Sequence, residues 1–183
     1  MTDGLAGKVL ALHALLDASA LPHAFGGALA LAYCTNEPRG TKDIDVNVFI
    51  GIDRLDELVA ALPAGIEVTA TDREAFTRDG QTRLWWNGTP VDVFLSNHPF
   101  HDHAEASARV VPFAGIDDLP ILACADLAVF KAFFGRAKDA VDVATMITAG
   151  TVEQVHLRST IVALLGEGER DHFFARVDDA LSD

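Results

Sequence analysis

Two aspartates, Asp43 and Asp45, stand one residue apart in the segment DIDVNVFI, residues 43–50. The alternation and β-branching of this segment predict a strand, so both carboxylates share one face while Ile44 points to the other. Two like charges on one face repel each other, and a divalent cation relieves that repulsion. Mg²⁺ prefers carboxylate and phosphate oxygens. The pair is a candidate metal site, although a solvated strand end is the commoner explanation of an isolated Asp-Ile-Asp.

A glycine pair, Gly26 and Gly27, comes directly before an apolar segment, residues 28–36, that is typical of a short helix. Glycine lets the backbone approach a ligand closely. The free N–H groups and the dipole at a helix start favour phosphate. We therefore regard the pair as a candidate phosphate site, with a tight strand-to-helix turn as the alternative.

A third aspartate, Asp92, lies in the apolar segment 91–95. Together with residues 81–86 and the turn pair Asn87-Gly88, this segment predicts a β-hairpin. An acid inside an apolar strand is costly unless it is paired, hydrogen-bonded or bound to a metal. Asp92 is therefore a candidate ligand, and a buried hydrogen-bonded aspartate is the alternative.

Charged residues gather around the end of an apolar helix segment. Lys131 lies among phenylalanines, and Arg136 and Lys138 follow it, with Asp139 and Asp142 on one face of the next helix. A lysine on an apolar stretch either extends to solvent or reaches into a site. The two acids are expected to pair with Arg136 and Lys138.

A histidine cluster and a tryptophan pair could also bind ligands, but structural roles are favoured for both. His98, His101 and His103 have a spacing that could bind a transition metal, yet an exposed helix cap is the favoured interpretation. Strand alternation sends one of Trp85 and Trp86 inward and the other outward. The outward ring could stack on a base, although packing is favoured.

The elements that position these residues come as strands first and helices last, which predicts the α+β class. We expect a small mixed β-sheet core with flanking helices over residues 1–115. A helical C-terminal region, 116–183, is expected to pack on it as a single compact unit. The predicted helices are 5–18, 28–36, 54–61, 100–107, 125–135, 137–149, 151–165 and 169–181, and the predicted strands are 23–27, 43–50, 66–70, 81–86, 91–95 and 109–113.

Composition limits the function. The chain has 183 residues, is 50% hydrophobic and carries a net charge of −13, so it can bury a core but does not attract phosphate backbones at long range. Nucleic acid would need a local basic patch, whereas a cationic small molecule or a basic protein fits more easily. Cys34 and Cys124 predict two buried free thiols rather than a disulfide framework or a zinc site. Without a membrane span or a signal peptide pattern, we expect a soluble cytoplasmic protein.

The order of these features resembles the nucleotidyltransferase superfamily that includes DNA polymerase beta. Residues 26–48, GGALALAYCTNEPRGTKDIDVNV, are similar to its first motif in the Gly-Gly variant of AbiEii-type toxin nucleotidyltransferases, with residues 39–43 as the lead-in. Residues 126–146 resemble the helical segment of the same relatives, and the resemblance covers roughly 23–149. One departure is that many catalytic members carry Ser where this chain has Gly27.

The resemblance implies a two-metal transfer of a nucleoside monophosphate from an NTP to a hydroxyl acceptor. Asp43 and Asp45 would hold two Mg²⁺ ions, and Asp92 would hold the catalytic ion and help deprotonate the attacking hydroxyl. Lys131 would join them as a catalytic residue that contacts the triphosphate. The implied nucleotide-binding residues are Gly26, Gly27, Arg39, Thr41 and Lys138.

The same resemblance also suggests an acceptor. It implies a toxin that acts on tRNA and has a cognate antitoxin protein as a partner. The alternatives are a small hydroxyl acceptor, as in aminoglycoside nucleotidyltransferases, or a non-catalytic binding or regulatory protein that keeps the fold. The tRNA hypothesis requires a basic rim near Asp43 on an otherwise acidic body. That rim is predicted to contain Arg39, Lys42, Arg83, Lys131, Arg136 and Lys138.

Overall fold

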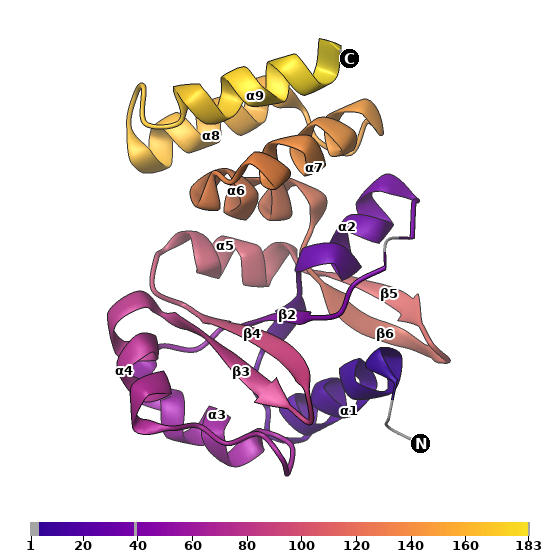
Figure 1. Cartoon of the computed structure of the whole chain (residues 1–183), viewed down its shortest axis with the longest axis vertical. Coiled ribbons are helices and arrows are strands. Elements are labelled where there is room, and N and C mark those ends of the chain that lie inside the picture. Colours follow the sequence, from indigo (N-terminus) through magenta and orange to yellow (C-terminus); the bar gives the residue numbers. More distant parts are fainter. Residues whose placement is uncertain (1–3, 39, 183) are drawn as a thin grey trace. The chain divides into compact units, whose positions relative to one another are not determined.

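The computed structural model describes residues 4–38 and 40–182 (Figure 1). Contacts divide the chain into two compact units. The first holds the residues up to Leu29 together with Gly40–Leu122. The second holds the residues between Leu29 and Gly40 together with those after Leu122. The chain therefore passes between the units after Leu29, before Gly40 and after Leu122. The domain boundary predicted after residue 115 stays a prediction.

The first unit is built on a six-stranded sheet in the order β3-β4-β2-β1-β6-β5. β2 pairs with β4 and β1 with β6 in parallel, and the other neighbours are antiparallel, so the sheet is mixed. The strands are β1 His23–Phe25, β2 Ile44–Val48, β3 Gln81–Trp86, β4 Thr89–Leu95, β5 Arg109–Phe113 and β6 Ile116–Ile121.

Helices complete the first unit, and α2 leads from it into the second. One face of the central strands is a closed apolar layer in which Ile44, Val46, Val91 and Val93 are at most 2% exposed. Burial of these side chains drives the sheet to fold against its helices. The helical elements are α1 Leu5–Ala18, α2 Gly27–Thr35, η1 Ile52–Arg54, α3 Leu55–Ala61, α4 Ala70–Asp79 and α5 Phe100–Ser107.

A buried lysine ties the first helix to the β3–β4 hairpin. Lys8 is 6% exposed, and its Nζ donates to the Trp86 carbonyl at 2.8 Å and to Thr89 Oγ1 at 2.7 Å. Hydrogen bonds at the turn satisfy the buried ammonium group. The hairpin that carries Asp92 is thereby fixed to the body of the unit.

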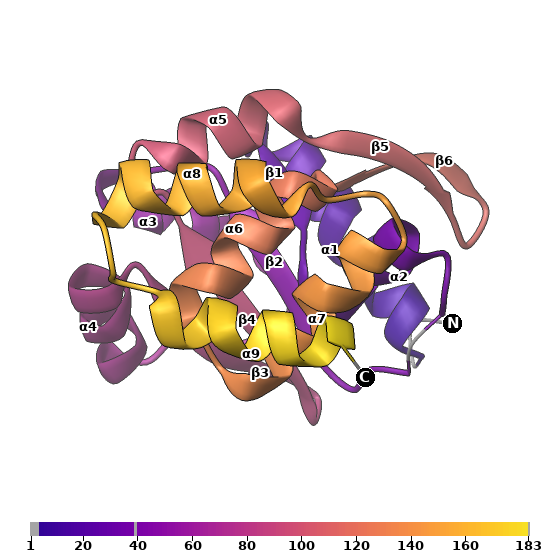
Figure 2. The ribbon, with the colours of Figure 1, turned by 90° about the horizontal axis from the view of Figure 1, so that it is seen from above.

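The second unit contains α6 Cys124–Phe134, α7 Ala137–Thr148, α8 Gln154–Leu165 and α9 Asp171–Ser182. α6 packs against α7 and α8, and α7 packs against α9 (Figure 2).

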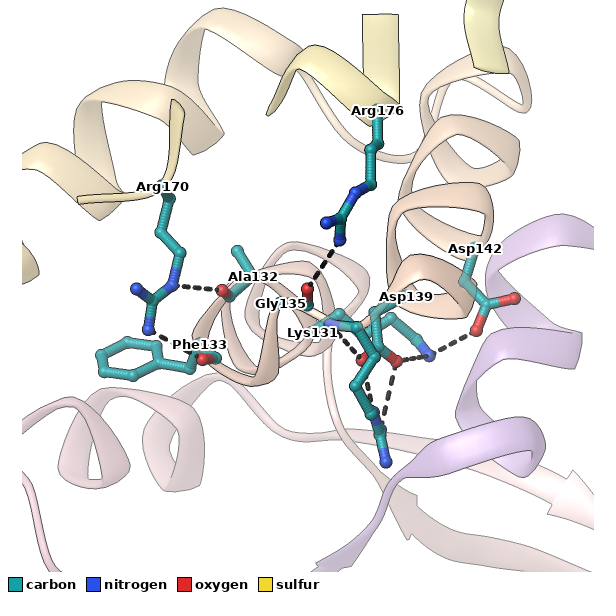
Figure 3. A network of polar contacts seen from close by, with 9 residues as sticks. Lys131, Ala132, Phe133, Gly135, Asp139, Asp142, Arg170 and Arg176 are labelled. Carbon is teal, nitrogen blue, oxygen red and sulfur yellow. Dashed lines mark hydrogen bonds and ion pairs between the residues drawn. The ribbon is translucent and has the colours of Figure 1, made fainter. Parts of the chain in front are cut away.

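Two arginines bind the carbonyl groups at the C-terminal end of α6 (Figure 3). Arg170 donates to the carbonyls of Ala132 and Phe133 at 2.9 and 3.0 Å, and Arg176 donates to that of Gly135 at 3.3 Å. Cations in this position satisfy carbonyls that the helix itself leaves unpaired.

Two stretches of the sequence prediction are wrong. The expected strand 66–70 is reduced to one bridge between Ile66 and Trp86, because Thr69 starts α4 through a capping box with Asp72. β6 was not predicted either, because its acids interrupt the apolar alternation that marks a strand. No helix in the described ranges is long and apolar enough to cross a membrane.

The prediction of two free thiols is also wrong. Cys34 and Cys124 are buried as expected, but they form a disulfide, with Cα atoms 5.6 Å apart. The bond joins the C-terminal part of α2 to the first residue of α6, both within the second unit. The two residues are 90 apart in sequence, so only the tertiary fold brings them within bonding distance.

Candidate functional site

Three charged side chains form a row across β2, β4 and β3. Asp45 lies directly opposite Asp92 in the parallel pair, and Asp92 lies directly opposite Arg83 in the hairpin. Residues opposite each other in register point to the same face of a sheet. Asp43 immediately precedes β2 and, two residues from Asp45, belongs to that face as well. The three predicted carboxylates therefore share one face of the first unit.

This face is the partly open side of the strands. The side chain of Asp92 is 19% exposed and that of Asp43 is 37% exposed, whereas the opposite face is the closed apolar layer. Asp92 is therefore not an acid placed in the core, because alternation turns it away from Val91 and Val93. Its carboxylate remains within reach of a ligand from solvent.

Arg83 supplies one positive charge to the three carboxylates. Its Nε and Nη2 donate to the two carboxylate oxygens of Asp92 at 2.7 and 2.6 Å, and Nη2 is 3.7 Å from Asp43 Oδ2. This is the bidentate geometry in which a guanidinium matches a carboxylate best. The hydrogen bond to Asp92 is the main reason that the pKa of Arg83 is raised above its ordinary value, with smaller contributions from the nearby Asp43 and Asp45.

The residues just before β2 position Asp43. The Thr41 hydroxyl donates to the Asp43 carboxylate, and the Asp43 N–H donates back to Thr41 Oγ1 at 3.3 Å. Thr41 was predicted to bind nucleotide, and its hydroxyl is engaged here in orienting a carboxylate. Arg39, the other residue predicted from this segment, lies outside the described residues.

The glycine pair packs directly on the carboxylate row. The Gly26 N–H donates to the Asp45 carbonyl at 2.9 Å, which joins the end of β1 to β2. Gly27 has a φ of +52°, and a Cβ added there would lie 1.9 Å from Asp45 Oδ2. The first residue of α2 therefore has no room for a side chain, which explains why Gly rather than Ser stands at position 27.

The carboxylates suit a hard divalent cation by their chemistry and by their shared face. Their side chains are not arranged as a finished metal centre, since no group of three acidic, histidine or cysteine side chains within the described residues is placed to hold an ion. Both oxygens of Asp92 accept hydrogen bonds from Arg83. Asp43, Asp45 and Asp92 could hold a metal once Arg83 releases Asp92.

Lys131 belongs to a buried network in the second unit (Figure 3). The residue is 7% exposed, and its Nζ donates to Asp142 Oδ2 at 2.6 Å and lies 3.5 Å from Asp139 Oδ1. Arg136 makes a second, bidentate pair with Asp139, at 2.6 and 3.1 Å. The two acids thus pair with Lys131 and Arg136 rather than with the exposed Lys138. A role for Lys131 and Lys138 at the nucleotide stays a prediction.

The histidine cluster takes a structural form. The N-cap of α5 is Pro99, and His98, one residue earlier, accepts the N–H of Phe100 at its Nδ1, at 3.1 Å. His101 is not exposed as expected: it is 7% exposed, and burial lowers its pKa from the ordinary value. The tryptophan pair alternates as predicted, with Trp86 buried and Trp85 57% exposed.

The role of Arg83 was missed, since the sequence analysis placed this residue only in a general basic rim. A signal was available in the hairpin itself. A two-residue turn at Asn87-Gly88 pairs residue 86 with 89, and continuing that register pairs Arg83 with Asp92. The contact of Arg83 with Asp43 had no such local signal.

Comparisons with known proteins were made for both sequence and structure. The sequence matches no family model and no curated protein. Among solved structures, the antibiotic-resistance factor ANT(2'')-Ia in solution aligns over 95% of this chain and 100% of its own, with a TM-score of 0.66 and 16% identity. ANT(2'')-Ia in complex with adenylyl-2''-tobramycin aligns over 86% and 97%, with a TM-score of 0.61 and 15% identity.

A third structure is an antigenic nucleotidyltransferase-like protein from Paracoccidioides brasiliensis. It aligns over 96% of this chain and 93% of its own, with a TM-score of 0.55 and 17% identity. Identities at this level establish a shared fold and leave the activity to be argued from the site. The chain therefore has the α+β nucleotidyltransferase fold that its sequence predicted, with a mixed sheet and flanking helices.

Proposed function

We propose that this chain, which has the nucleotidyltransferase fold, is a metal-dependent enzyme that moves a nucleoside monophosphate from an NTP to a hydroxyl acceptor. The observation that carries the proposal is the shared face of Asp43, Asp45 and Asp92, against which the Gly27 backbone packs without room for a side chain. Carboxylates held together in this way are costly unless a cation compensates them.

Each residue has a separate task in this proposal. Asp43, Asp45 and Asp92 would hold two Mg²⁺ ions, which supply stabilisation of the attacking and leaving oxygens. Asp92 would accept the proton of the acceptor hydroxyl. That oxygen then bonds to the α-phosphorus while the bond to the bridging oxygen breaks, and pyrophosphate leaves.

The surrounding groups orient the carboxylates. Thr41 holds the Asp43 carboxylate through its hydroxyl. Backbone N–H groups at the start of α2, next to Gly27, would receive phosphate, as the positive end of a helix dipole favours. Lys131 and Lys138 remain proposed phosphate contacts, and Lys131 would have to leave Asp142 to make one.

Charge guides the choice of acceptor. Of the residues expected to form a basic rim, Arg83, Lys131 and Arg136 are already compensated by carboxylates, which reduces the field that they offer to a polyanion. The net charge of −13 further disfavours the binding of a polyanion. We therefore favour a small hydroxyl compound over tRNA, and an AbiEii-like toxin with its antitoxin becomes the competing hypothesis.

The experiment is a transfer assay with Mg²⁺ and each α-³²P-labelled NTP. Total tRNA and a panel of aminoglycosides serve as separate acceptors. Asp43→Asn, Asp45→Asn and Asp92→Asn should each lower transfer by more than about a hundredfold, since loss even of a group that only supports a metal ligand costs 10–100-fold. Asp117→Asn is the matched control, because this exposed acid lies on β6 of the same sheet.

Thermal unfolding of each variant separates loss of chemistry from loss of fold. Label on tRNA but on none of the small acceptors would reverse our preference for the acceptor. If wild type labels no acceptor, or the three Asp→Asn variants keep the activity of Asp117→Asn, the proposed function is wrong.

A further inference from the structure

Arg83 and a metal ion at Asp92 would be two cations on one carboxylate, and they repel each other at that distance. The guanidinium engages both carboxylate oxygens of Asp92, at 2.7 and 2.6 Å. Any cation bound by Asp92 must take at least one of those oxygens. The two partners therefore compete for one carboxylate, and binding of either weakens binding of the other.

The competition extends beyond a single pair. Nη2 of Arg83 is 3.7 Å from Asp43 Oδ2, so one guanidinium interacts with two of the three candidate ligands. The hairpin register sets this position, because Arg83 faces Asp92 directly across β3 and β4. The hairpin register therefore places the arginine as a counter-charge beside the carboxylate row.

The guanidinium is also able to leave. Half of the Arg83 side chain is exposed, while Asp92 is 19% exposed. β3 is the outermost strand of the sheet beside the row. A long side chain at such a position can move to solvent without disturbing packed groups, and its planar fork binds phosphate as well as it binds carboxylate.

We propose that Arg83 is a gate on Asp92. It holds the carboxylate away from metal until a triphosphate offers the guanidinium another anionic partner. Asp92 then becomes free to bind the ion, so metal enters this position together with the nucleotide. This inference rests on the proposed function, since it requires that the row binds metal at all.

The test measures binding of Mn²⁺ alone, by the electron paramagnetic resonance signal of the free ion. Arg83→Gln should bind Mn²⁺ about fivefold more tightly than wild type, the factor expected for loss of one well-formed exposed ion pair. Arg83→Lys keeps the charge but loses the fork, so it should fall between the two. Arg54→Gln is the matched control, because Arg54 makes the same Nε and Nη2 pair with Glu57 on α3.

A second measurement follows the transfer of Arg83 to phosphate. The preformed complex of Mn²⁺ with inorganic tripolyphosphate should bind Arg83→Gln more weakly than wild type, although the ion alone binds this variant more tightly. If Arg83→Gln binds both the ion and the complex more tightly than wild type by the same factor, Arg83 competes with metal without passing to phosphate. That result overturns the gate.

The outcomes separate this inference from the proposed function. If Asp45→Asn abolishes Mn²⁺ binding but Arg83→Gln leaves it unchanged, the row binds metal and only the gate is wrong. If Asp45→Asn and Asp43→Asn both leave Mn²⁺ binding unchanged, the metal site itself is wrong, and the proposed function falls with it.

Discussion

At the scale of single residues, the backbone of Gly27 lies so close to Asp45 that the two positions depend on each other. A side chain at position 27 would be strained by the left-handed backbone and would meet the Asp45 carboxylate. Phosphate contact at this position must then come from backbone N–H groups alone.

Substitution of this glycine tests the contact. Gly27→Ala should lower the free energy of unfolding by about 1–2 kcal/mol from the left-handed backbone, with a further loss from the displaced carboxylate. Gly88→Ala is the control, since Gly88 has a φ of +78° and open space for a Cβ. Urea unfolding compares the two, and equal losses would contradict a steric role for Asp45.

His23 gives the stability a pH dependence. The ring is 8% exposed, and burial is the main cause that lowers its pKa from the ordinary value of 6.5. Its Nδ1–H donates to the Leu21 carbonyl at 2.8 Å, so Nε2 is the acceptor for His13, 2.9 Å away. A proton on Nε2 would end its role as acceptor and require His13 to change tautomer. Of the facing charges, His13 opposes protonation and Asp17 favours it.

The lowered pKa of His23 sets the direction in which stability changes with pH. The unfolded chain takes up the proton near pH 6.5 and the folded chain only at lower pH, so stability is full above 6.5 and declines as pH falls toward the folded value. Urea unfolding between pH 7.5 and 5.5 should show this decline. His23→Gln should flatten it, whereas exposed His156→Gln should not. A buried His101 with a lowered pKa contributes in the same direction, so some decline remains.

At the scale of elements, the disulfide fixes α2 to the start of α6. The bond closes a loop of 90 residues, and such a bond restricts the unfolded chain more than the folded one. Cys34→Ala with Cys124→Ala should lower the free energy of unfolding by about 2–4 kcal/mol. Mass spectrometry after alkylation without reductant checks that the bond is present. If both thiols alkylate in the denatured protein without reductant, the free-thiol interpretation returns.

At the scale of the whole molecule, the net charge of −13 governs the choice of acceptor. A protein that binds tRNA through several phosphate contacts loses affinity steeply with salt. Three of the cations expected in the basic rim are compensated by carboxylates. We therefore expect tRNA binding to be weak and its affinity to change little between 50 and 200 mM salt. Over the same range, a protein with ~6–10 phosphate contacts would lose ~10³–10⁵ in affinity. Filter binding over that range measures the slope, and a fall of that size would support the tRNA hypothesis instead.

The local sequence determined the parts of this protein that depend on period and turn chemistry. Alternation placed Asp43 and Asp45 on one strand face, and Asn87-Gly88 set the hairpin that carries Asp92. Competing local signals caused the errors. The capping box at Thr69 replaced an expected strand by α4, and the acids of β6 hid a strand.

Only the tertiary structure decided which distant segments meet. The parallel pairing of β2 with β4 joins Asp45 to Asp92, and the disulfide joins Cys34 to Cys124. Neither pairing leaves a mark in the local pattern. Each depends on how the whole chain buries its apolar surface, a sum over many residues that no short segment contains. The candidate carboxylates could therefore be proposed from the sequence, whereas their partners, Arg83 above all, were fixed by the fold.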